Sequence, residues 1–297
     1  MSAFADGSKI AALLRRLEAT GDEPGIRQLQ DLQAEGTDHT WLWIAASTSG
    51  FAIRQQEFRT AVRMRIGADV LDEEMPCACC GGVIDRRGLH CLRCAPGEST
   101  RGHNWVAGTL LGLASLSDAS SLAEPRGLVP SRPGLRPADL LTTTAFGRGA
   151  ALDVSIVSPD SEGAGSDACA ATVKHKLAKY GPILRELDAE GFDYRPLVWT
   201  CWGRPDPEAR VAVRTLACAA ARRRGLGDPR VLERHASAIV GCFIWRRAAA
   251  MVHACVGWHA ATDVQELLAP LEGSDDGDHE TAGDAAAEAV AAPVAAA

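Results

Sequence analysis

Long apolar runs and aromatic residues are both scarce in this sequence of 297 residues. Only 5% of the residues are Phe, Trp or Tyr, and no apolar stretch reaches the ~18 residues that a membrane span needs. Residues 1–17 hold Asp6 and Lys9 but no apolar core of the signal-peptide type. These absences argue against a membrane or secreted protein, so we expect an intracellular protein with no membrane partner.

An excess of basic residues is also missing, since the formal net charge is −7. The negative charge comes from residues 272–297, which hold seven acidic residues and no Lys or Arg. The rest of the chain has 31 basic and 31 acidic residues. Arginines cluster in that neutral remainder, at Arg54, Arg59, Arg63 and Arg65, at Arg126, Arg132 and Arg136, and at Arg222, Arg223 and Arg224. Phosphate binding needs local positive patches rather than a positive total. Nucleic-acid contact therefore stays open, with solvated helix faces as the alternative.

Periodicity and turn residues predict the order of the elements. Helices are expected over residues 8–33, near 58–66 and over 103–116, 168–180, 207–224 and 228–256. Strands are expected over 138–141, 150–157 and 195–200, and residues 124–136 read as loop or irregular strand. Gly181-Pro182 should interrupt or end its helix, or Pro182 could open a further helix up to residue 190.

This order predicts an α/β (α+β) fold with a mixed central sheet flanked by helices. We expect four segments: a helical N-terminal part (1–72), a cysteine-rich module (73–100), the main domain (101–271) and a disordered acidic, Ala-rich tail (272–297).

Five of the ten cysteines fall between Cys77 and Cys94. In a chain without a secretory signal, such a cluster indicates metal rather than disulfides. Cys77-x2-Cys80 and His90-x3-Cys94 form the two close pairs that a tetrahedral Zn²⁺ needs, and Gly81-Gly82 lets the backbone wrap the ion. We predict a structural zinc held by Cys77, Cys80, His90 and Cys94. The spare thiols Cys79 and Cys91 could replace a ligand, and a loop of free thiols is the alternative.

Two acids and a lysine form a second candidate site. Asp139 begins one predicted strand and Asp153 lies inside the next, so a short antiparallel connection could bring them together. The following helix carries Lys174, Lys176 and Lys179, and its expected apolar stripe is Val173, Leu177, Tyr180 and Leu184. Two carboxylates that hold Mg²⁺ and a nearby ammonium suit phosphodiester hydrolysis. A buried salt bridge between Asp153 and a lysine is the plainer alternative.

Four pieces occur in order along residues 41–203: Phe58-Arg59-Thr60-Ala61-Val62-Arg63-Met64-Arg65-Ile66-Gly67; the Cys/Cys/His/Cys pattern with Asp85, Arg86 and Gly88 inside it; Arg101-Gly102-His103-Asn104; and the strand acids Asp139 and Asp153 before Lys176-x2-Lys179-Tyr180. Together they resemble the tail of non-LTR retrotransposon proteins, in which a restriction-like endonuclease follows a zinc knuckle.

The resemblance implies a PD-(D/E)xK-type fold that nicks target DNA with a divalent metal. Asp139 and Asp153 would then be the Mg²⁺ ligands and Lys176 the catalytic lysine, supported by Lys179 and Tyr180. Arg101, His103 and Arg136 would contact the nucleic acid. The chain has no Tyr/Phe-x-Asp-Asp motif, which implies a fragment, a relic or a separate nuclease module, nuclear if it acts as a retroelement protein.

Three functions therefore compete. The first is a Mg²⁺-dependent DNA endonuclease, and the second is an inactive DNA- or RNA-binding relic with the same knuckle. The third is a structural protein that a bound zinc ion stabilises. Metal-dependent nicking distinguishes the first from the others, and salt-dependent binding without cleavage supports the second.

Overall fold

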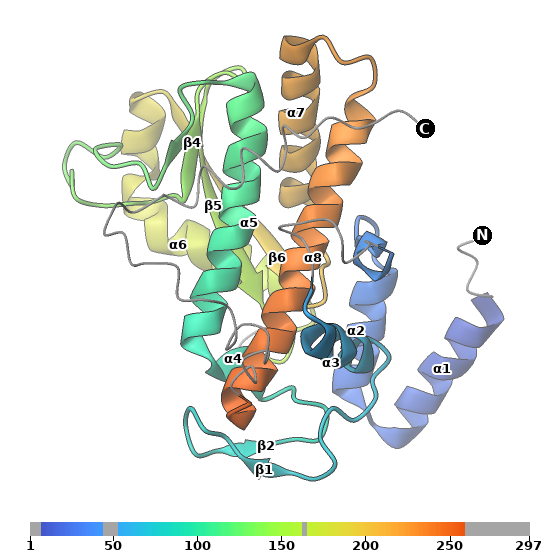
Figure 1. The fold of residues 1–297 in the computed structure, drawn as a ribbon. Helices are drawn as coiled ribbons and strands as arrows, with labels where there is room; N and C mark the ends of the chain where they lie inside the picture. The colour runs from blue at the N-terminus through green and yellow to red at the C-terminus, as the bar shows by residue number, and fades with distance from the viewer. Residues whose placement is uncertain (1–6, 44–52, 162–164, 259–297) are drawn as a thin grey trace, which may run out of the picture.

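The computed structural model describes residues 7–43, 53–161 and 165–258 (Figure 1). These residues form a mixed α/β fold. The helices are α1 (Gly7–Thr20), α2 (Glu23–Gln33), α3 (Gln55–Arg65), α4 (Cys91–Cys94), α5 (Pro96–Ser117), α6 (Ala168–Ala189), α7 (Pro207–Arg224) and α8 (Pro229–Val256), with a 3-10 turn η1 (Thr40–Leu42). The strands are β1 (Met75–Pro76), β2 (Val83–Ile84), β3 (Leu122–Ala123), β4 (Leu140–Thr142), β5 (Gly149–Val157) and β6 (Phe192–Thr200). The predicted tail, residues 272–297, lies outside the described residues.

The main sheet has the order β3-β4-β5-β6 and is mixed, as the sequence predicts. β4 is antiparallel to β3 and β5, and its register with β5 pairs Leu140 with Leu152. β5 and β6 run parallel along their whole length, with Asp153 opposite Pro196. The connection between these parallel strands is α6, because parallel neighbours need a crossover.

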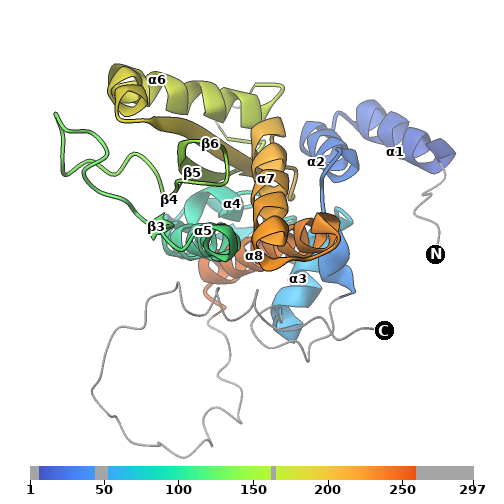
Figure 2. The ribbon, with the colours of Figure 1, turned by 90° about the horizontal axis from the view of Figure 1, so that it is seen from above.

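Helices cover both faces of the main sheet, which makes three layers (Figure 2). α6 lies on one face, and α5, α7 and α8 lie on the other. The side chains of β5 alternate accordingly: Leu152 and Val154 pack with α5, α7 and α8, whereas Ala151 packs with Ile183 and Leu187 of α6. Asp153 shares the α6 face with Ala151, because side chains two residues apart in a strand point the same way.

A second core joins the N-terminal part to the cysteine-rich module. It contains Trp41, Met64, Cys77, Ile84 and Cys91 together with side chains of α8. Trp245 of α8 stacks on Trp41 with ring centroids 4.9 Å apart. The long helix α8 therefore contributes side chains to the core of the N-terminal part as well as to the core beside the main sheet.

The predicted break at Gly181-Pro182 is wrong, because α6 runs through it from Ala168 to Ala189 with Pro182 inside. Pro182 and Ala178 are both exposed, so the carbonyl that loses its partner faces water, where the loss costs least. Ile183 and Leu187, just beyond, are buried against the sheet and hold the second half of the helix in place.

The predicted apolar stripe of α6 is also shifted. Leu177 is 40% exposed, whereas Cys169, Ile183 and Leu187 are buried. Lys176 follows Cys169 by seven residues and precedes Ile183 by seven, so it lies within the buried stripe rather than beside it. The lysine is thereby directed at the sheet.

α8 differs from the expectation that no apolar stretch is long enough to span a membrane. Among the described residues it is the one helix that meets that test by length and composition. However, 83% of its apolar window is buried inside the protein, as in the core helix of a globular fold. Its Arg247 is 3% exposed and donates to Ser99 Oγ at the start of α5, at 2.8 Å.

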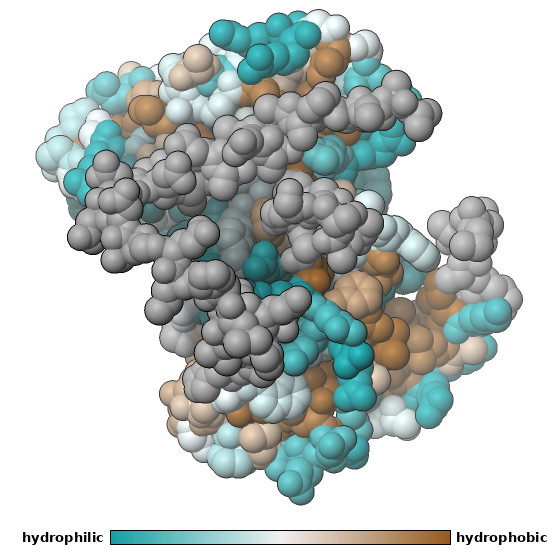
Figure 3. All heavy atoms as spheres, viewed as in Figure 1, coloured by the Kyte–Doolittle hydropathy of each residue, from teal (hydrophilic) through white to brown (hydrophobic). Residues whose placement is uncertain are grey.

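α1 and α2 lie at the edge of the molecule, where Figures 1 and 2 both show α1 beside α2. Apolar residues, brown in Figure 3, gather on the surface over this part. Leu13 of α1 is 44% exposed. The N-terminal helices thus leave apolar surface uncovered by the described residues.

Candidate functional site

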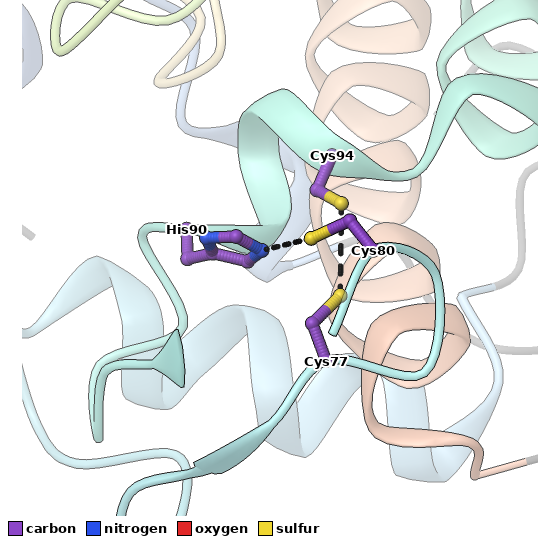
Figure 4. A group of neighbouring side chains, drawn as sticks. All are labelled: Cys77, Cys80, His90 and Cys94. Atoms are coloured by element: carbon purple, nitrogen blue, oxygen red, sulfur yellow. Dashed lines mark hydrogen bonds between the residues drawn. The ribbon is translucent and has the colours of Figure 1, made fainter. Parts of the chain in front are cut away.

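Cys77, Cys80, His90 and Cys94 converge (Figure 4). They lie at the end of the molecule that carries β1 and β2 (Figure 1). Their ligand atoms all lie within 4.8 Å of one another. Cys77 Sγ is 3.6 Å from Cys94 Sγ, and Cys80 Sγ is 3.3 Å from His90 Nε2. These separations suit a tetrahedral ion with metal–sulfur bonds of ~2.3 Å. The four predicted ligands therefore form a group that could hold a metal ion.

Local backbone structure brings these side chains together. Gly81 has φ +72, a left-handed conformation that glycine adopts without strain, and its N–H donates to the Cys77 carbonyl at 2.8 Å. A Cβ at Gly82 would lie 3.2 Å from the His90 ring. On the other arm, Asp85 accepts the His90 N–H at 2.9 Å. The two glycines and Asp85 thus shape the loops that carry the ligands.

The thiols of this group influence one another. Burial raises the pKa of Cys77, but hydrogen bonds from the backbone of Cys79 and Cys80 and from the neighbouring side chains outweigh it and lower the pKa to about 6. Burial and the thiols of Cys80 and Cys77 raise the pKa of Cys94 to about 12. The charge of one thiolate thus disfavours ionisation of its neighbour.

Asp139 and Asp153 also come together. Asp139 directly precedes β4, and the β4–β5 register extended by one residue sets it opposite Asp153. The Val154 N–H donates to Asp139 Oδ2 at 2.6 Å, and His103 Nε2 of α5 lies 3.1 Å from Asp139 Oδ1. Each carboxylate oxygen of Asp139 therefore has one partner and keeps a lone pair free for another.

Lys176 completes this group from the other side. Its Nζ lies 2.5 Å from Asp153 Oδ1 and 3.3 Å from the Val154 carbonyl. The Tyr194 hydroxyl of β6 donates to Asp153 Oδ2. Burial raises the pKa of Asp153, with Asp139 adding to the effect, whereas Lys176 and Tyr194 oppose it. A buried carboxylate beside a second one is the arrangement that a cation stabilises.

The remaining predicted residues lie around this centre rather than in it. Lys179 is exposed, with Nζ 4.9 Å above the Tyr180 ring, and the Tyr180 ring packs on that of Tyr194 at 5.1 Å. Arg101 and Arg136 are exposed and form ion pairs with Glu98 and Glu124. Tyr180 thus reaches the site through Tyr194, and neither arginine contacts the carboxylates.

Tyr194 is the residue of this group that sequence reasoning misses. The predicted strand starts at Arg195, whereas β6 starts at Phe192. In the parallel register Tyr194 pairs with Ala151, two residues before Asp153. The alternation of Phe192, Tyr194 and Pro196 on one face was the available signal.

Comparison of this chain with protein-family models, with curated proteins and with solved structures finds no match.

Proposed function

We propose that this protein is a divalent-metal-dependent DNA endonuclease that nicks duplex DNA. The observation that carries the proposal is the convergence of Asp139, Asp153 and Lys176. The two acids face each other across β4 and β5, and the lysine of α6 lies 2.5 Å from one of them. A structural salt bridge needs only one acid and one base, so a salt bridge between Asp153 and Lys176 does not account for the second carboxylate.

The donor set suits Mg²⁺, which prefers carboxylate, carbonyl and water oxygens. Asp139 and Asp153 would hold it, with the Val154 carbonyl close by, and the raised pKa of buried Asp153 fits a site built for a cation. When bound, Mg²⁺ supplies a more acidic water and offsets the charge of the phosphate.

The protein's own side chains would act around that ion. Lys176 orients the attacking water or stabilises the negative charge that develops on the phosphate. The Tyr194 hydroxyl holds Asp153, and His103 together with the Val154 N–H holds Asp139. The exposed Arg101 precedes His103 by two residues on α5, so on release from Glu98 it would contact the backbone of DNA that extends beyond the site.

For the cysteine-rich module we propose a structural zinc knuckle with Cys77, Cys80, His90 and Cys94 as ligands. Three thiols and one imidazole fill a tetrahedral zinc and leave no position for a reacting water. Cys77 belongs to the core that also holds Trp41 and Trp245, which supports a role in fixing this end of the molecule.

We further propose that the fold is restriction-endonuclease-like and of non-LTR retrotransposon origin. Two features support it: the order α5, β3 to β5, α6, β6, and the position of the three reacting groups on adjacent strands and the crossover helix. As a retroelement nuclease, the protein would act in the nucleus.

Nicking of a supercoiled plasmid tests the proposal. The full chain with Mg²⁺ should convert supercoiled DNA to open circles, and EDTA should stop the conversion. Asp139→Asn and Asp153→Asn should each lower the rate at least ~10²-fold. Asp188→Asn changes an exposed acid of α6 and should retain the wild-type rate.

The outcomes separate the competing functions. Unchanged nicking in both site variants would overturn the proposal. Salt-dependent DNA or RNA binding by a chain that never nicks would favour the inactive binding relic. Absence of both activities would leave a structural protein.

A further inference from the structure

A second group of thiols lies next to the four-ligand cluster. The Sγ atoms of Cys77, Cys79 and Cys255 lie within 4.8 Å of one another. Cys255 belongs to the last turn of α8, far from the other two in sequence. Cys77 and Cys255 are buried, at 3% and 0% exposure, whereas Cys79 is exposed. Three thiols from two distant segments thus meet at the end of one helix.

Backbone contacts fix this meeting point. The Ala78 N–H donates to the Cys255 carbonyl at 2.7 Å, and the Cys79 thiol lies 3.8 Å from the Ala254 carbonyl. Gly257 caps α8 with φ +73, and a Cβ there would lie 3.8 Å from that of Ala78. The loop of the knuckle is therefore docked on the C-terminal end of α8.

We propose that a second Zn²⁺ binds here, held by Cys77, Cys79 and Cys255, with Cys77 as a thiolate shared by both ions. The proposal rests on the zinc knuckle put forward above. Tetrahedral thiolates around zinc lie ~3.8 Å apart for zinc–sulfur bonds of ~2.3 Å, so the sulfur atoms need to close in by at most ~1 Å, within the reach of side-chain rotation. The exposed side, next to Cys79, leaves the fourth position to water.

The adjacent residues Cys79 and Cys80 then bind different ions. Cys80 binds the first ion, and Cys79 binds the second. This pairing gives a role to Cys79, which the four-ligand site leaves unused. Cys91, hydrogen-bonded to Cys255, is positioned to donate to the Cys255 thiolate as an outer partner.

Charge balance is compatible with the second ion. One zinc with three thiolates and a neutral imidazole carries one excess negative charge, and a second zinc with two further thiolates leaves that excess unchanged. The end of α8 adds carbonyl groups and the negative pole of the helix dipole, which stabilise a cation. The charge of a buried Cys255 thiolate would thereby be offset by the ion that it binds.

The zinc content of the full chain, measured by inductively coupled plasma mass spectrometry after loading with Zn²⁺ and gel filtration, tests the proposal. The wild type should hold two zinc ions per chain. Cys79→Ser and Cys255→Ser should each lose one. Cys79 is exposed, so its variant separates loss of the ion from loss of the fold. Cys218→Ser, on α7, is the control and should keep both ions.

The result also separates this site from the knuckle. A wild type with one zinc that Cys79→Ser and Cys255→Ser both retain overturns the second site and leaves the knuckle intact. Two ions in either of these variants would overturn the ligand assignment. A wild type without zinc would overturn the knuckle and the second site together.

Discussion

Asp139 lies directly opposite Asp153 where β4 meets β5, and its carboxylate accepts the N–H of Val154, the residue after Asp153, at 2.6 Å. The carboxylate of Asp139 thus takes a backbone donor of the strand that carries the other acid. The position of one acid therefore depends on the strand of the other. Changes that move β5 should affect both carboxylates at once.

The first prediction concerns the lysine. Lys176→Ala removes the ammonium that lies 2.5 Å from Asp153 Oδ1, and we expect nicking to fall about 10²- to 10³-fold, the usual cost of losing one group that stabilises the transition state. DNA binding should be largely retained, because the lysine side chain is mostly buried. Nicking rates and gel-shift binding, measured on the same preparations, check both expectations.

Lys179→Ala is the matched control, since it removes an exposed ammonium from the same helix. It should nick at the wild-type rate. Full activity in Lys176→Ala would contradict the assignment, and a loss confined to Lys179→Ala or Lys174→Ala would transfer the catalytic role to that lysine.

The second prediction concerns the zinc. Stripping the metal with a chelator should expose the loops around Cys77 and His90 to protease, because the ion would be the link that ties these two loops to each other. The effect should spread to Trp41 and Trp245, which share a core with Cys77, and tryptophan fluorescence should report it. Protease resistance that is identical with and without metal would count against a structural zinc.

Local patterns predicted much of the main domain. The pattern of residues 150–157 predicted β5, and Ala- and Arg-rich periodicity predicted α7 and α8 almost to their ends. The Asp139–Asp153 pairing was also predictable, because the connection between the two strands is short. These features depend on residues close together in sequence, whose geometry the backbone dictates.

Contacts between distant segments were not predictable in the same way. Tyr194 reaches Asp153 only through the parallel register of β5 and β6, and Cys255 meets Cys77 only because α8 ends beside the knuckle. α6 passes through Pro182 because packing of Ile183 and Leu187 outweighs one missing hydrogen bond. These features depend on packing between distant segments, which no local sequence pattern indicates.

The third prediction concerns pH and stability. Burial alone would raise the pKa of Asp118, but hydrogen bonds from Ser120 and Thr143 outweigh it and lower the pKa below its ordinary value of 3.8. Because the folded state favours the ionised form, the stabilisation is present above about pH 4 and is lost as the pH falls towards the folded-state pKa. Asp118→Asn should therefore cost about 2–3 kcal/mol at pH 7.

Urea unfolding of the wild type and of Asp118→Asn at several pH values checks this. The difference between their free energies of unfolding should narrow as the pH falls below about 4, because protonation of the wild-type carboxyl removes its advantage. Asp188→Asn, at an exposed acid, should show little difference at any pH. If the difference in free energy of unfolding between the wild type and Asp118→Asn stayed constant with pH, the charge of Asp118 would not be the source of the stabilisation.

The last prediction concerns the packing of α5 on α8. A Cβ at Gly102 would lie 2.4 Å from Cδ of Arg247 and 2.5 Å from its Cβ and Cγ, and that buried side chain is held by Ser99. Because the atoms near its backbone cannot swing away, Gly102→Ala should destabilise the fold by about 1–3 kcal/mol, the usual cost of overpacking.

Gly97→Ala, on the same helix with no described atom within 4 Å of the new Cβ, should leave the stability unchanged or raise it by up to ~1 kcal/mol. Thermal unfolding compares the two, and equal melting temperatures would show that α5 and α8 do not touch at Gly102.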